Sequence, residues 1–163
     1  MATVNALGIT NYPKDPLFQG GQIIKRVRAL IYNATAFSDG DIVVLAKSLP
    51  VNARIVNINL PQGNAARTGL SDIDFGFYRQ DNGAVIDKDV LVDGDTMASA
   101  RTSAIGILGE NISGFDFTKT IGGLLSLTSE TEPSGGVNLC ATINTAGSTT
   151  GTIIVDIDIA YPA

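Results

Sequence analysis

The sequence of 163 residues contains no histidine, no tryptophan and a single cysteine, Cys140. Catalysis by Ser-His-Asp or Cys-His groups, zinc bound by histidine and cysteine-rich metal sites all need residues that this chain lacks. Carboxylates, lysines, serines and tyrosines are present, so the chemistry of those groups is the only catalytic route left open. We therefore expect the protein not to be an enzyme, and to have no cofactor and no bound metal.

The lone cysteine also excludes an internal disulfide. Cys140 lies in the apolar run 137–143, where a thiol is expected to behave as a small buried hydrophobic group rather than as a reactive nucleophile. A single cysteine leaves the redox compartment undetermined.

Aromatic residues make up only 6% of the chain, and the absence of tryptophan weakens the case for carbohydrate binding. The formal net charge is -5 and the pI is about 4.5, which opposes attraction to nucleic acid or to anionic membranes. The one basic cluster, Lys25, Arg26 and Arg28, lies among apolar residues and is typical of a strand with one solvated face.

No apolar run approaches the roughly 18 residues of a membrane helix, and no signal-peptide pattern begins the chain. We expect no nucleic-acid partner, no membrane association and synthesis in the cytoplasm.

The residue types that are abundant favour strands. The chain has 11 valines, 18 isoleucines and 15 threonines against 3 glutamates and 5 lysines. Its length suits one domain with a hydrophobic core large enough to fold without disulfides or metal. The leading fold class is therefore all-β.

From residue 22 onward, short apolar runs alternate with turn residues, which is the pattern of a sandwich or barrel. The clearest period-two alternation is in 72–78 and 152–160. The expected strands are 22–32, 41–46, 54–60, 72–78, 84–86, 104–108, 124–128, 137–143 and 152–160, with a short helix around 96–100. Eight or nine strands without long helices predict an antiparallel β-sandwich, jelly-roll-like, in one domain over residues 22–163.

Residues 1–21 differ from the rest because glycines and prolines interrupt any periodicity. We interpret this segment as an extended N-terminal arm, with Tyr12, Leu17 and Phe18 as its candidate partner-binding residues. The arm could dock on a partner protein, on a neighbouring subunit or on its own domain.

Acidic residues gather between Asp72 and Asp95, where seven aspartates fall within 24 positions; the six singled out are Asp72, Asp74, Asp87, Asp89, Asp93 and Asp95. Such a group could bind calcium, but positions counted from Asp87 do not match the helical calcium loop. Aspartates that form turns and protect sheet edges are the favoured interpretation. The pair Asp156 and Asp158 is likewise interpreted as a solvated strand face rather than an acid/base pair.

Four segments resemble head decoration (cement, or auxiliary capsid) proteins of tailed bacteriophages: GDIVV at 40–44, LPVNARI at 49–55, DIDFGF at 72–77 and VLVDG at 90–94. The resemblance covers roughly residues 40–100 and includes no catalytic signature. It implies a β-sandwich, often a jelly roll, on the capsid exterior of the virion. Such proteins bridge neighbouring major capsid proteins, commonly as a homotrimer with an extended terminal arm.

The primary hypothesis is therefore a virion structural protein that clamps adjacent capsid subunits, with Leu17 and Phe18 as the best arm anchor. The alternative is a phage tail or fibre module that binds a host receptor or glycan through the polar loops within 128–151. A carboxylate-dependent hydrolase that uses residues 72–95 is the third and least favoured class.

Overall fold

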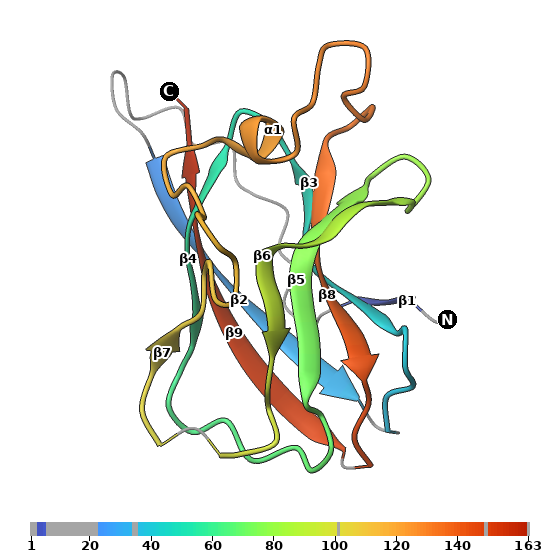
Figure 1. The fold of residues 1–163 in the computed structure, drawn as a ribbon, viewed down its shortest axis with the longest axis vertical. Helices are drawn as coiled ribbons and strands as arrows, with labels where there is room; N and C mark the ends of the chain where they lie inside the picture. The colour runs from blue at the N-terminus through green and yellow to red at the C-terminus, as the bar shows by residue number, and fades with distance from the viewer. Residues whose placement is uncertain (1–2, 6–22, 34–35, 101, 149, 163) are drawn as a thin grey trace.

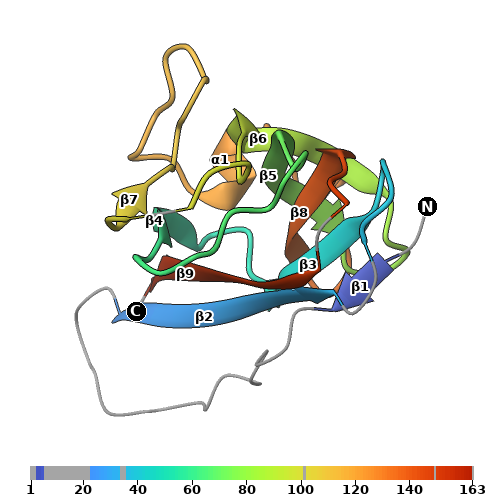
Figure 2. The ribbon, with the colours of Figure 1, turned by 90° about the horizontal axis from the view of Figure 1, so that it is seen from below.

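Two β-sheets packed face to face form the fold in the computed structural model (Figures 1 and 2). The structure describes residues 3–5, 23–33, 36–100, 102–148 and 150–162. The strands and the one short helix of these residues are β1 (Thr3–Asn5), β2 (Ile23–Asn33), β3 (Ile42–Leu49), β4 (Arg54–Leu60), β5 (Asp72–Arg79), β6 (Val85–Asp95), β7 (Ile105–Gly106), α1 (Ile121–Leu124), β8 (Val137–Thr145) and β9 (Gly151–Tyr161).

The strand order is that of a jelly roll with one added strand. The first sheet has the order β1-β3-β8-β5-β6 and the second the order β2-β9-β4-β7. All pairings among β2 to β9 are antiparallel. Without β1, each sheet has four strands, and most connections cross from one sheet to the other, as in an eight-stranded jelly roll. The predicted all-β, antiparallel sandwich is confirmed.

The core lies between the sheets and follows the alternation visible in the sequence. In β9 the buried apolar residues are Ile153, Val155, Ile157 and Ile159, and in β5 the facing residues include Phe75. Successive side chains of a strand point to opposite faces, so this spacing places every second residue in the sandwich. Each such large side chain stabilises the fold by about 1.5–3 kcal/mol through burial.

The N-terminal segment contributes a strand that the sequence did not reveal. Thr3–Asn5 pairs in parallel with β3 at the edge of the first sheet, with Thr3 opposite Ile42. Residues 6–22 lie outside the described residues, and with them the candidate contacts Tyr12, Leu17 and Phe18. Their role in binding a partner, and the division at residue 21, stay predictions.

The helix expected at 96–100 is wrong. Residue 97 is held by backbone hydrogen bonds to another loop: Met97 N–H donates to Leu70 O at 2.9 Å, and Arg67 N–H donates to Met97 O at 2.8 Å. These long-range partners hold the chain in an irregular path and leave no local helical bonding. None of the helices in the described ranges is long and apolar enough to span a membrane.

The strand expected at 124–128 is also wrong, because the one-turn helix α1 ends there. The side chain of Thr120 accepts a hydrogen bond from Gly123 N–H at 3.2 Å and so caps the start of the helix. Conversely, β6 runs on to Asp95, well beyond the expected 84–86, because pairing with β5 satisfies its backbone despite the low strand propensity of aspartate.

Candidate interaction surface

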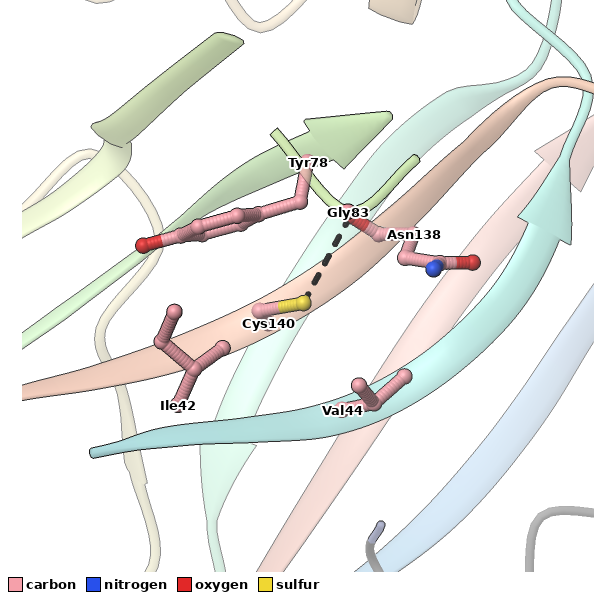
Figure 3. A pocket seen from close by; sticks show the side chains of 6 residues that line it. All are labelled: Ile42, Val44, Tyr78, Gly83, Asn138 and Cys140. Carbon is pink, nitrogen blue, oxygen red and sulfur yellow. Dashed lines mark hydrogen bonds between the residues drawn. The ribbon is translucent and has the colours of Figure 1, made fainter. Parts of the chain in front are cut away.

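The outer face of the five-stranded sheet carries a small apolar cluster that is separate from the core. Its members are Ile42 and Val44 from β3, Tyr78 from β5 and Cys140 from β8. They gather around a hollow of about 50 Å³, which Gly83 and Asn138 also line (Figure 3). An apolar cluster on the outward face of a sheet is a feature that the alternating pattern alone does not predict.

Cys140 is buried in this cluster, 1% exposed. Burial raises the pKa of its thiol to about 12. The thiol is therefore protonated at neutral pH and is not a nucleophile, which agrees with its interpretation as a small hydrophobic group.

A larger hollow of about 340 Å³ continues along the same face, from an apolar to a polar end. Its apolar part is lined by Ile42, Tyr78 and Val85, and its polar part by Lys88 and Asn144. The hydroxyl of Tyr78 is hydrogen-bonded at 2.7 Å to Thr142, and burial raises the pKa of Tyr78. The space is large enough for a partner's side chain, and this face is a candidate contact surface.

At the polar end, three strands bring charged and amide groups into one network. Asp74 in β5 is buried, and its Oδ1 accepts a hydrogen bond from Gly94 N–H at 3.0 Å. Asp74 Oδ2 accepts from Asn144 Nδ2 at 2.6 Å and lies 3.1 Å from Lys88 Nζ. Asn144 Nδ2 also donates to Asp72 Oδ1 at 3.0 Å, and Lys88 Nζ donates to Asn144 Oδ1 at 2.8 Å.

Of the acidic residues singled out in the sequence, Asp72 and Asp74 of β5 belong to this network, and Asp87, Asp89, Asp93 and Asp95 lie beside it on the edge strand β6. Carboxylate oxygens of Asp74, Asp89 and Asp93 gather within 4.8 Å of one another, next to a hollow of about 360 Å³. Burial and the neighbouring Asp89 raise the pKa of Asp87. Lys88 supplies a positive charge at Asp74, so these contacts do not require a cation. The placement on β6 fits the interpretation as edge-protecting aspartates.

Two of the three residues of the basic cluster, Arg26 and Arg28, lie on the outer face of the second sheet, paired with acidic residues of β9, whereas Lys25 points to the other face and lies over the ring of Tyr161. Arg26 binds Asp158 and Arg28 binds Asp156, each through two hydrogen bonds of 2.7 and 2.8 Å. These bonds hold the pKa of both carboxylates below the usual range. The predicted solvated face is confirmed for Arg26 and Arg28, whose side chains are exposed, but it is wrong for Asp156, which is buried beneath the guanidinium of Arg28.

The segment between β7 and α1 protrudes from the sandwich (Figure 2). It carries Phe117, an exposed aromatic residue that the sequence pattern did not single out. Phe117 is 58% exposed and contacts Phe115 edge to face, with ring centroids 4.8 Å apart. Between them, Asp116 accepts hydrogen bonds from the backbone and the hydroxyl of Thr118 at 2.9 and 2.6 Å. This local turn gives Phe117 a defined position at the surface.

Comparison with known proteins identifies the fold. No protein-family model and no curated protein matches the chain. Among solved structures, a chain in the "Capsid of Ralstonia phage GP4" matches with a TM-score of 0.57 at 18% identity, over 99% of each chain. A chain in the "Cyanophage Pam1 capsid asymmetric unit" matches with a TM-score of 0.49 at 17% identity, over 93% of this chain and 96% of that one. The protein thus has, over nearly its whole length, the fold of a chain in the capsid of Ralstonia phage GP4.

Proposed function

We propose that the protein is a structural component of a phage virion that binds the outside of the head and bridges neighbouring major capsid proteins. The observation that carries the proposal is the match with the Ralstonia phage GP4 capsid chain, which covers 99% of both chains.

The described residues support a structural rather than an enzymatic role. The thiol of Cys140 is buried, and the carboxylates of Asp74, Asp156 and Asp158 are engaged in ion pairs. A protein that stabilises a shell needs a rigid fold and contact surfaces, which the two-sheet core and the outer-face hollow provide. The partner in this proposal is the major capsid protein, and the location is the capsid exterior.

Heads of the phage that encodes the protein, assembled without it, test the proposal directly. We expect the purified protein to bind expanded heads saturably and to raise their resistance to heat, because a bridge stabilises the assembled state by mass action. Co-sedimentation and differential scanning calorimetry of the heads measure both effects. Absence of binding to heads, together with saturable binding to host envelope material, would instead support a tail or fibre module.

The proposal includes a homotrimer, for which the expected solution mass is about three times the 17.0 kDa of the chain. Light scattering at several concentrations checks this. A species of 17.0 kDa at every concentration contradicts a preformed trimer. The protein would then associate only on the head.

A further inference from the structure

Lys88, Asn144 and Asp74 have the geometry of a site for covalent self-modification. The Nζ atom of Lys88 lies 2.8 Å from Oδ1 of Asn144, which is one bond away from the carboxamide carbon. Oδ2 of Asp74 contacts both nitrogens, at 3.1 Å from Lys88 Nζ and 2.6 Å from Asn144 Nδ2. A carboxylate that contacts the amine and the amide nitrogen can transfer a proton between them.

The sheet holds the three residues together from separate strands. In the order β8-β5-β6, Asp74 is on the central strand, while Asn144 and Lys88 are on its two neighbours. A bulge in β6 separates the partners of Phe75 and Phe77, which are Val92 and Asp87. The backbone of this bulge lies against Gly76 of β5, and Lys88 reaches across β5 to Asn144.

The amide of Asn144 presents its carbonyl oxygen to Lys88. Its Nδ2 faces two carboxylates, Asp72 at 3.0 Å and Asp74 at 2.6 Å, so its carbonyl faces the lysine. The nitrogen that would leave is therefore the one beside the proton donor. Because the fold holds the amine, the carbonyl and the proton carrier in contact, the reaction is intramolecular and avoids the entropy cost of bringing separate reactants together.

We propose that Lys88 and Asn144 form an intramolecular isopeptide bond, with Asp74 as the proton carrier. Asp74 accepts a proton from the Lys88 ammonium, and the neutral amine attacks Cγ of Asn144. Asp74 then protonates Nδ2, and the Cγ–Nδ2 bond breaks as the nitrogen of Lys88 loses its second proton to Asp74, which passes it to the departing ammonia. One Cγ–Nζ bond forms and one Cγ–Nδ2 bond breaks. The ammonium and the carboxamide become an amide and an ammonium ion, with no oxidant or cofactor.

The reaction is expected to be slow. Burial lowers the pKa of Lys88, but the hydrogen bond and charge of Asp74, with Asp89 and Tyr78 nearby, outweigh burial and raise the pKa above its usual value. The neutral amine is therefore a minor species at neutral pH and becomes more populated as pH rises. The side chain of Asp74 is 2% exposed and that of Lys88 is 44% exposed, so the proton carrier is shielded while ammonia can leave.

The bond would join β6 to β8 across β5 and close a chain segment between residues that are 56 positions apart. A cross-link of this span restricts the unfolded chain and should raise the Tm by about 10 °C relative to the unlinked protein. This inference concerns the chain itself and holds whether or not the protein binds phage heads.

Intact-mass spectrometry of the denatured protein tests the inference after several days at mildly alkaline pH. We expect the mass to fall by about 17 Da, the mass of ammonia, as the modification proceeds. Trypsin should then fail to cut after Lys88, and should release a branched peptide that joins residues 80–101 to residues 120–163. Lys88→Arg keeps the positive charge but cannot form the amide under these conditions, so it should show no branched peptide.

Asp74→Asn tests the role of Asp74 as proton carrier, because asparagine has nearly the same shape as aspartate but cannot carry the proton. In this variant Lys88 and Asn144 should stay unlinked. Thermal unfolding confirms that each variant is folded. Asn82 is followed by Gly83 and can lose ammonia through its own backbone, so Asn82→Ala is the control for that route. Absence of the branched peptide from the wild-type protein, or a mass loss that disappears entirely in Asn82→Ala, overturns the inference.

Discussion

Replacing Gly76 by alanine is expected to destabilise the protein by about 3 kcal/mol, at the upper end of the cost of overpacking. A Cβ atom at this position would lie 2.4 Å from the Lys88 carbonyl carbon, and closer still to Asp87 O. Both are backbone atoms of the β6 bulge, so no side-chain rotation relieves the clash. β5 and β6 must separate, which breaks hydrogen bonds between β5 and the edge strand β6.

Thermal unfolding measures the effect, which should be a fall in Tm of about 6–12 °C for a domain of this size. Gly123→Ala is the matched control, because its Cβ would have ordinary contacts, 3.4 Å from Thr120 Oγ1, and alanine favours the helix in which it lies. The control should melt at the wild-type temperature or slightly above it. Equal Tm values for the two variants would show that β6 does not cross Gly76 as closely as the structure has it.

Substituting both Leu17 and Phe18 by serine is expected to weaken head binding by about a thousandfold. This prediction rests on the proposed function and on the interpretation of residues 1–21 as a docking arm. Burying a leucine and a phenylalanine contributes about 4 kcal/mol in total, and each 1.4 kcal/mol is a factor of ten in affinity. Titration of heads with labelled protein gives the dissociation constants.

Two substitutions are cleaner than deletion of the arm, because deleting residues 1–21 also removes β1 from the edge of β3. Phe117→Ser is the matched control: it removes an exposed aromatic side chain outside the arm. If Phe117→Ser weakens head binding while the arm variant binds normally, the contact is made by the loop between β7 and α1. The arm mechanism would then be wrong.

The sequence by itself determined the fold class and the chemistry that the chain lacks. Period-two alternation in β9 and β5 identified buried strand faces, because a strand with one face in the core needs an apolar residue at every second position. The same reasoning recognised the solvated face of β2 that carries Arg26 and Arg28, although it could not pair Arg28 with Asp156. The absence of histidine excluded whole classes of site without any structure.

Only the tertiary structure decided which residues of different strands and loops contact one another. The contact of Lys88 with Asn144 depends on the order β8-β5-β6 and on the bulge in β6, and neither has a signal in local composition. The helix α1 depends on the cap at Thr120 and on the packing of Gly122 against Val51. Hydrophobic periodicity is a local property of the chain, whereas register, bulges and the meeting of polar side chains arise from pairing between segments that are distant in sequence.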